Sequence, residues 1–424
     1  MDSSKRLFLK TAAAALATPL AGCATTAVSF RNGVIGVDAF PPPIDVRERQ
    51  QRVARAQALM HTHQIDAILL EPGSAMAYFS GIDWWRSERL VAVIIPAQGD
   101  IAVVAPHFEE PSIRELMTFG DDVRTWQEHD DPFALVNGIL SDRGLAGSRR
   151  LGLEDTVRYF VPDGLRRSAP ELDLVAATPV TLGCRMYKSD NELRLMRAAN
   201  QVTLSAYEEV MATISEGMTG DDIKQRMNAA QAARGGKSAW SIALIGPASA
   251  YPHGTKKQAP LRRGDIVLMD AGCGVHGYKS DISRTFVLGA ANSEQRTMWN
   301  HVREGQERAM VAARLGVPAG KVDDTVRAWY ASLGYGPGYA TPGLSHRTGH
   351  GIGMDGHEPV NFVHGETTPL APGMCFSNEP GLYDFSRFGV RIEDCLYMTE
   401  DGAKWFTEPP DSIDAPLGRM GPVI

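Results

Sequence analysis

The stretch Ile266–Thr285, IVLMDAGCGVHGYKSDISRT, decides the fold of the C-terminal part of this chain. An apolar strand leads into Asp270, the chain turns over at Gly274–Gly277, and a second strand returns past Asp281. This pattern predicts a β-hairpin that sets the two carboxylates across from each other on one face.

A second stretch, Met374–Met398, repeats the design with Glu379 and Glu393 on either side of a turn around Ser386. Four carboxylates on paired strands repel one another and raise each other's pKa unless positive charge lies between them. A metal ion is the natural counter-charge, and two ions would leave every acid ionised. The two hairpins therefore predict a metal centre.

Long amphipathic helices precede each hairpin. We expect them at residues 189–215, 219–236, 293–315 and 319–332. The first begins with the capping box of Ser189 and Glu192, and the turns Gly217–Asp222 and Gly316–Asp324 are alike. Residues 184–408 are therefore predicted to be an internal duplication, two helix–helix–hairpin halves whose helices cover one curved antiparallel sheet.

The region before the duplication, residues 46–180, alternates helical and strand patterns. The pattern predicts helices at 46–61 and 157–168, and strands at 66–70, 76–79, 90–95, 101–104 and 151–154. This alternation favours an α/β domain, followed by a second domain over residues 181–424. The segment Trp84–Arg86 is a candidate loop for the site of a neighbouring subunit, although paired tryptophans are more often core or interface residues.

The first 23 residues resemble an export signal. Residues 4–10 are basic, residues 11–20 are small and apolar, and Leu20–Cys23 resembles a lipobox. The basic part resembles a twin-arginine signal in which Lys5 replaces the first arginine, so the export route stays open. We expect an exported protein, periplasmic or held to a bacterial membrane by a lipid on Cys23; the alternative is an unstructured N-terminus with an incidental cysteine.

Residues 24–45, with three consecutive prolines, are expected to form a tether.

Composition argues against several classes of protein. A net charge of −7 gives no reason to expect nucleic acid as a partner. Four cysteines besides Cys23 are too few for a disulfide framework in 424 residues. No later segment approaches the apolar length of a transmembrane helix, so the only expected membrane contact is the lipid.

The histidines complete the predicted metal site. His350 lies in the glycine-rich loop His346–Gly353, where backbone and imidazole can approach a ligand closely. It is the expected fifth metal ligand, and His253 and His357 are expected donors on flanking loops. A single histidine is more often structural, but four of the 11 fall in the two loops before the acidic hairpins. Asp265, after Gly264, and Asp394, beside Glu393, are expected to be turn residues or solvated charges.

These residues resemble a known family, the pita-bread metallopeptidases (M24), with Xaa-Pro dipeptidases (prolidases) and aminopeptidase P the nearest likeness. The five matching stretches are Met269–Gly272, Ser280–Thr285, His346–Glu358, Asn378–Gly381 and Val390–Asp394. The likeness covers almost the whole chain after the tether and includes a creatinase-like N-terminal domain.

The resemblance implies a role for each matched residue. Asp270 would hold one metal, His350 and Glu379 the other, and Asp281 and Glu393 would bridge both. His253 and His357 would orient the substrate and stabilise the tetrahedral intermediate, while Arg391 would restrain the acids. Independently, chemistry suggests that Glu379 takes the proton of a metal-activated water and passes it to the leaving nitrogen.

The implied substrate is a peptide with proline at the second position, and the implied assembly is a homodimer. Oxygen donors with one imidazole suit Mn(II) and would accept Co(II) or Zn(II). One departure bears on specificity: Asn361 stands where many prolidases carry the arginine that receives a dipeptide's carboxylate. Longer Xaa-Pro peptides, a lyase or broader hydrolase on the same metal site, and a non-enzymatic binding module stay open as alternatives.

Overall fold

The computed structural model describes residues 40–145 and 149–423. The expected export signal at residues 1–23, including Cys23, and most of the expected tether lie outside the described residues. Among the described helices, none combines the length and the hydropathy needed to cross a bilayer.

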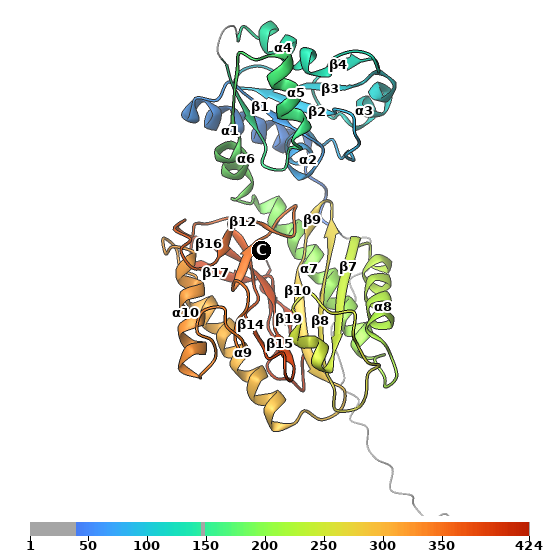
Figure 1. Ribbon diagram of the computed structural model, residues 1–424, viewed down its shortest axis with the longest axis vertical. Coiled ribbons are helices and arrows are strands. Elements are labelled where there is room, and N and C mark those ends of the chain that lie inside the picture. Colours follow the sequence, from blue (N-terminus) through green and yellow to red (C-terminus); the bar gives the residue numbers. More distant parts are fainter. Residues whose placement is uncertain (1–39, 146–148, 424) are drawn as a thin grey trace, which may run out of the picture. The chain divides into compact units, whose positions relative to one another are not determined.

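The N-terminal domain is built on a six-stranded mixed sheet (Figure 1), with strand order β4-β3-β2-β1-β5-β6. Its strands are β1 Ala67–Leu70, β2 Ala92–Pro96, β3 Ala102–Pro106, β4 Asp122–Trp126, β5 Arg149–Leu153 and β6 Leu172–Ala176. Its helices are α1 Val46–His63, α2 Ser74–Ser80, α3 Glu110–Leu116, α4 Pro132–Asp142, α5 Phe160–Ser168 and α6 Thr178–Arg185, with a 3₁₀ turn, η2, at His107–Glu109. Strands β1, β2 and β3 are buried along their whole length because helices pack on both faces of the sheet. The predicted α/β class is confirmed.

One predicted strand of this domain is wrong. The short run Met76–Phe79 forms part of helix α2, which ends at Gly81 with a left-handed φ of 83°. Four apolar residues fit a buried helix as well as a buried strand, so periodicity could not separate the two.

The C-terminal domain begins with the predicted long helices, α7 Asp190–Met211 and α8 Gly220–Ala233. The second pair, α9 Ser293–Ala312 and α10 Gly320–Ser332, also lies where the sequence predicts it. The capping box of Ser189 and Glu192 is formed at the start of α7.

Each helix pair is followed by antiparallel strands. The first half contains β7 Lys237–Ile245, β8 Ile266–Val275, β9 Tyr278–Lys279 and β10 Ile282–Val287, in the order β10-β8-β7, with β9 paired to β8 and a 3₁₀ turn, η3, at Gly246–Ala250. The second half contains β11 Gly349–Gly351, β12 Glu358–Phe362, β13 Cys375–Asn378, β16 Asp394–Thr399 and β17 Gly402–Trp405, in the order β12-β11-β13-β16-β17. Two short pairs complete the domain, β14 Gly381–Tyr383 with β15 Gly389–Arg391, and β18 Thr407–Glu408 with β19 Arg419–Met420.

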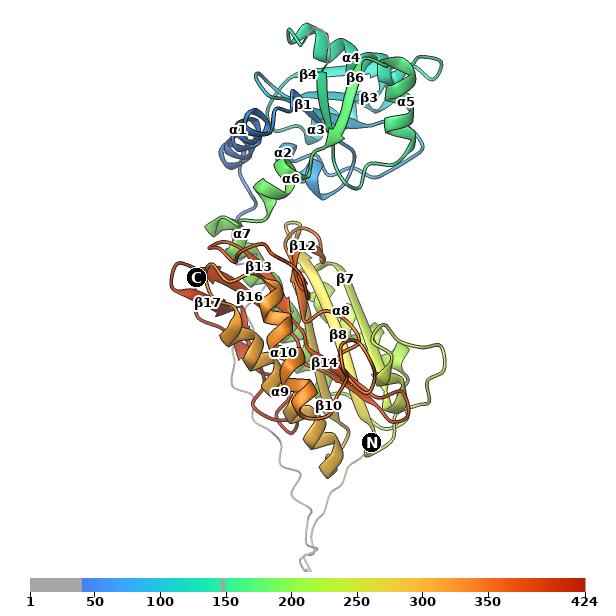
Figure 2. The same cartoon turned by 60° about the vertical axis from the view of Figure 1, so that its left-hand side comes forward.

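Hydrogen bonding divides the expected single sheet into two, which meet along β10. The Glu393 N–H donates to the carbonyl of Ser283 at 3.1 Å, and the Arg391 N–H donates to Thr285 Oγ1 at 3.2 Å. Helices α7 and α8 pack on the first half, and α9 and α10 pack side by side on the second (Figures 1 and 2). The acid-bearing strands of both halves therefore meet at the centre of the domain.

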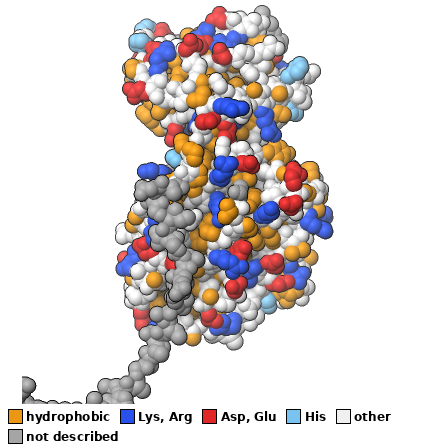
Figure 3. Space-filling view, turned by 180° about the vertical axis from the view of Figure 1, so that it is seen from behind, with side chains coloured by type: hydrophobic (Ala, Val, Ile, Leu, Met, Phe, Trp, Pro, Cys, Tyr) orange, Lys and Arg blue, Asp and Glu red, His pale blue; other side chains and the backbone are white. Residues whose placement is uncertain are grey.

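The surface carries charges of both signs. On the face shown in Figure 3, basic and acidic side chains are interspersed with apolar ones.

Candidate metal centre

The five predicted ligands come from five places on the two sheets. Asp270 lies on β8, and Asp281 immediately precedes β10. His350 is the middle residue of β11, Glu379 follows β13, and Glu393 immediately precedes β16. The side chains of Asp270, Asp281, His350 and Glu393 are buried, and that of Glu379 is 13% exposed.

The strand register corrects one detail of the prediction. Asp270 pairs with Ser283 and Ala271 pairs with Ile282, so Asp281 lies two residues along from Asp270 on the same face rather than directly opposite. The second hairpin matches the prediction, because the pairs Asn378–Asp394 and Gly381–Arg391 bracket Glu379 and Glu393 and place them opposite each other.

The folded chain brings all five side chains together. His350 Nε2 lies 3.1 Å from Glu379 Oε1 and 3.7 Å from Asp281 Oδ2. Donor atoms lie within 4.8 Å of one another in each of three overlapping groups: Asp270, Asp281 and Glu393; His350, Glu379 and Glu393; and Asp281, His350 and His357.

The electrostatics of this cluster fit divalent cations. Burial, reinforced by the neighbouring carboxylates, raises the pKa of Asp281 and of Glu393 well above the ordinary carboxyl value. One oxygen each of Asp270, Asp281 and Glu393 is buried without a hydrogen-bond partner among the described residues. Unpaired buried carboxylate oxygens are costly, and ligation to metal ions would satisfy them while keeping the acids ionised.

Arg391 is a cation that the chain itself places against the acids. Its Nη2 donates to Asp270 Oδ2 at 2.7 Å, and its Nε donates to Ser283 Oγ at 2.9 Å. The Ser283 hydroxyl in turn donates to Glu393 Oε2 at 2.7 Å. Arg391 Nη1 also donates to the carbonyl of Pro252 at 3.2 Å. The guanidinium therefore fixes acids from both hairpins and anchors the loop that carries His253.

Sequence reasoning missed two residues of this network, Tyr383 and His346. The Tyr383 hydroxyl accepts from Arg391 Nη1 at 3.2 Å and lies 2.8 Å from His346 Nε2. Burial lowers the pKa of His346 to about 4, so the neutral ring accepts from the tyrosine and its Nδ1–H donates to the carbonyl of Arg347 at 2.7 Å. Tyr383 is separated from His346 by 37 positions, and no spacing rule marked the pair.

The expectation for Asp394 is wrong. Its carboxylate is fully buried and paired with Arg284, whose Nη2 lies 2.7 Å away. An acid beside a metal ligand can be structural and buried because alternate strand residues point into the sheet's opposite, helix-covered face.

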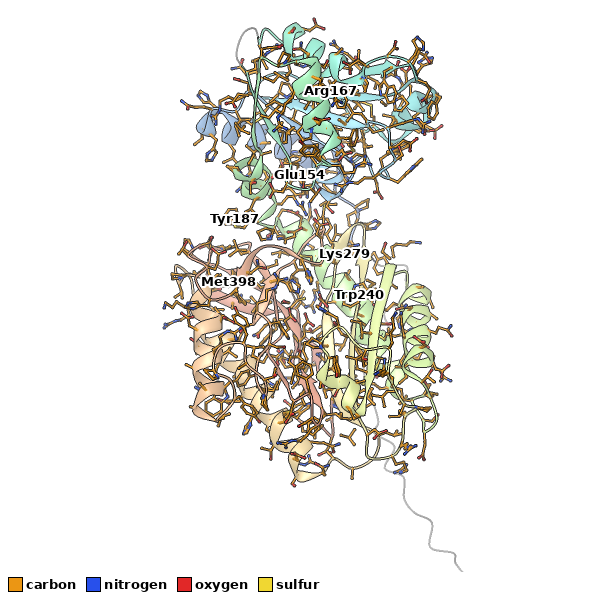
Figure 4. All side chains as sticks on the ribbon, viewed as in Figure 1. Glu154, Arg167, Tyr187, Trp240, Lys279 and Met398 are labelled. Carbon is orange, nitrogen blue, oxygen red and sulfur yellow. The ribbon has the colours of Figure 1, made fainter. Side chains whose placement is uncertain are left out.

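The cluster opens into a cavity of about 660 Å³. The lining residues are Trp240, Ile242, Pro252, His253, Asp270, Asp281, His346, Arg347, His350, Gly356, His357, Glu379, Arg391 and Glu393. Figure 4 labels Trp240, which comes from β7. Both outer histidines of the sequence analysis, His253 and His357, therefore face the same space as the five ligands, and the His357 ring lies 4.1 Å from that of His350.

Comparison with known proteins identifies the families that match the two domains. The model of metallopeptidase family M24 matches residues 194–400, and the model of the creatinase/prolidase N-terminal domain matches residues 52–187. The chain is 33% identical over 364 residues to a probable dipeptidase PepE of Mycobacterium tuberculosis, covering 85% of this chain and 94% of the relative.

Two further relatives are prolidases. The chain is 28% identical over 361 residues to an Xaa-Pro dipeptidase of Pyrococcus horikoshii, covering 84% of this chain and 97% of the relative. The crystal structure of recombinant prolidase from Thermococcus sibiricus superposes with a TM-score of 0.78 at 27% identity, covering 89% of this chain and 98% of that one.

Proposed function

The chain belongs to metallopeptidase family M24, and we propose that it hydrolyses Xaa-Pro dipeptides at a centre of two divalent metal ions. The observation that carries the proposal is the buried cluster of four carboxylates and one imidazole with unpaired oxygens facing a cavity. The Xaa-Pro relative from Pyrococcus horikoshii supports the choice of substrate.

The clustering of donor atoms supports the proposed ligand set. Asp270, Asp281 and Glu393 would hold one ion, and His350, Glu379 and Glu393 the other, with Asp281 near enough to His350 to bridge. When bound, such ions supply a water of lowered pKa and polarise the scissile carbonyl. Mn(II) is our proposal for the metal because the donors are mostly hard oxygens, with Co(II) and Zn(II) as alternatives.

Glu379 is suited to move the proton. Burial alone would raise the pKa of its carboxyl, but its bond to His350 and nearby positive charge hold it well below the usual range. The ionised carboxylate accepts a proton from the attacking water and delivers it to the leaving nitrogen of proline. The nitrogen can leave only as an amine, so cleavage of the C–N bond requires that it gain a proton.

His357 is suited to donate a hydrogen bond rather than a proton. Burial, with the neighbouring His350 and Arg347, lowers its pKa to about 4, so the ring is neutral near pH 7. A neutral imidazole N–H aimed into the cavity stabilises the oxyanion that forms on the scissile carbonyl. His253 faces the same cavity from the loop that Arg391 anchors, and we assign it to orienting the substrate.

The setting of the enzyme is also a proposal. We propose that the protein is exported and is periplasmic or anchored by a lipid on Cys23, on the basis of its N-terminal sequence. We further propose a homodimer in which the loop with stacked Trp84 and Trp85 contacts the partner. The ring centroids of these tryptophans are 4.2 Å apart and Trp85 is 60% exposed, which is unusual for a tryptophan that has no partner.

A substrate panel tests the proposed function. The Mn(II)-loaded protein is assayed with alanyl-proline, alanyl-alanine and alanyl-prolyl-alanine. We expect hydrolysis of alanyl-proline, dependence on Mn(II), and little turnover of alanyl-alanine. Preference for the tripeptide would indicate an aminopeptidase, and turnover of none of the three with a fully loaded centre would contradict the proposal in favour of a lyase, another hydrolase or a binding module.

A further inference from the structure

The catalytic cavity is lined by two arginines that differ in their surroundings. Arg391 is engaged by Asp270, Ser283, Tyr383 and the carbonyl of Pro252. The guanidinium of Arg347, by contrast, has no hydrogen bond or ion pair with any residue in the described ranges 40–145 and 149–423. Arg347 is therefore a half-buried cation that lines the cavity without a counter-charge from the part of the chain that the structure describes.

The backbone that carries Arg347 is fixed on both sides. On one side, the ring of His346 bonds the Arg347 carbonyl and the Tyr383 hydroxyl. On the other side, the N–H and hydroxyl of Thr348 donate to Asp323 Oδ1 at 3.1 and 2.7 Å. The side chain of Arg347 therefore starts from a fixed point on the cavity wall.

The charge of the cavity favours an anion. Four carboxylates face it, and two divalent ions would neutralise them. The Arg391 guanidinium would then share Asp270 with the metal centre. Arg347 would remain as positive charge that no described residue neutralises. A planar guanidinium pairs with a carboxylate through two parallel hydrogen bonds.

Arg347 lies in the cavity where the C-terminal carboxylate of a bound dipeptide would have to lie. In an Xaa-Pro dipeptide the free carboxylate carbon lies about 2.5 Å from the scissile nitrogen, because only the proline Cα separates them. The group that binds this carboxylate must therefore share the cavity with the residues that act at the scissile bond. Arg347 lines the same cavity as His357 and the five proposed metal ligands.

Asn361 does not supply the missing charge. It lies opposite His350 in the β11–β12 pair, and its amide is neutral. An amide offers a carboxylate a hydrogen bond without the charge that makes such bonds strong.

We propose that Arg347 binds the C-terminal carboxylate of the substrate and so makes this enzyme a dipeptidase despite Asn361. The inference rests on the proposed function, because it names the recognition group for the leaving proline. It restricts the substrate class to dipeptides whose free carboxylate follows the scissile bond directly.

Binding of an uncleavable ligand tests the inference independently of turnover. The probes are alanyl-proline with a methylene in place of the scissile carbonyl, and the same compound with a C-terminal amide. Each is titrated by calorimetry into the Mn(II)-loaded wild type and the Arg347→Gln variant. We expect wild type to prefer the acid, and the variant to bind the acid roughly 10- to 100-fold more weakly, as for a lost charge-assisted hydrogen bond, with a much smaller change for the amide.

Two further variants sharpen the test. Arg314→Gln, at an exposed arginine away from the cavity, is the matched control and should bind like wild type. Adding Asn361→Arg to Arg347→Gln should restore part of the preference for the acid, which a merely structural role of Arg347 would not predict.

The outcomes separate the two proposals. Equal binding of acid and amide by wild type, or an equal loss for both in Arg347→Gln, overturns the inference about Arg347 and leaves the proposed function standing. A protein that prefers the acid through Arg347 but hydrolyses no Xaa-Pro dipeptide supports the inference and contradicts the proposed function.

Discussion

At the scale of single residues, His357 is the proposed catalytic group that can best be separated from the metal ligands. We expect His357→Ala to lower kcat by roughly 10²- to 10³-fold, because the oxyanion loses a hydrogen-bond donor, while both metal ions stay bound. Steady-state kinetics and elemental analysis of the same preparation measure the two effects. The exposed His129, changed to alanine, is the control.

Two results would contradict this role of His357. Full turnover in the variant would remove the residue from the mechanism. Loss of one metal ion would instead indicate that His357 is a metal ligand. The donor atoms of His357, Asp281 and His350 lie within 4.8 Å of one another, so this alternative is a specific one.

The clustering of the proposed ligands could be predicted from the sequence because each acid stands in a strand–turn–strand pattern, although the exact register of Asp270 and Asp281 could not. Their supporting residues could not. Arg391 reaches Asp270 across 121 positions, and Tyr383 reaches His346 across 37. Such bonds depend on how the two halves of the domain pack. The burial of Asp394 could not be predicted for the same reason, because its partner Arg284 lies on the other half.

At the scale of elements, Gly349 controls how closely β11 approaches β13. A Cβ at this position would lie 2.1 Å from the backbone carbonyl oxygen of Ser377, and backbone cannot yield as a flexible side chain would. We expect Gly349→Ala to lower the free energy of unfolding by about 1–3 kcal/mol and to weaken metal binding by displacing His350. Denaturant unfolding and metal titration measure these effects.

The matched control is Gly356→Ala, since a Cβ there meets nothing within 4 Å. Its free energy of unfolding should stay close to that of wild type. If Gly349→Ala unfolds and binds metal like wild type as well, the close approach of the strands is not what positions His350.

The first residue of β12, Glu358, gives the stability of this region a pH dependence. Its carboxylate is buried, 3.0 Å from Lys188 and 2.6 Å from Arg185. Burial raises its pKa, but the two cations outweigh burial and lower the pKa to about 2. A folded-state pKa below the unfolded value stabilises the fold at pH values above the unfolded pKa, and this contribution is lost as pH falls toward the folded value.

We therefore expect Glu358→Gln to cost on the order of 3 kcal/mol of unfolding free energy at pH 7. The difference from wild type should shrink as pH falls from about 4.5 toward 2. Urea unfolding of both proteins across this range measures it, with the exposed Glu88→Gln as control. A difference independent of pH would mean that Glu358 stabilises through packing rather than charge.

Local signals predicted the elements best where they were strong. The capping box at Ser189 and the amphipathic pattern behind it placed α7, and the turn at His276 and Gly277, with φ values of 47° and 92°, closes the first hairpin as expected. Short apolar runs such as Met76–Phe79 carry no such signal. The division of the expected sheet into two could not be foreseen either, because it depends on hydrogen bonds between the halves.

At the scale of the whole molecule, the site is a product of the duplication. One half supplies Asp270 and Asp281, the other supplies His350, Glu379 and Glu393, and neither half has a complete set of ligands. The repeated helix–helix–hairpin order made this arrangement predictable from the sequence, since each half carries one acid pair at the same place. The central claim is that the assembled cluster holds two divalent ions.

Metal stoichiometry tests that claim most directly. The protein and its Asp281→Ala variant are saturated with Mn(II), freed of excess metal and analysed for manganese per chain, with the exposed Asp401→Ala as the matched control. The account predicts two ions per chain in wild type and control, and loss of both sites in Asp281→Ala, because Asp281 shares a donor group with Asp270 and Glu393 and also lies 3.7 Å from His350. Two tightly held ions in Asp281→Ala, or none in the folded wild type, would contradict it.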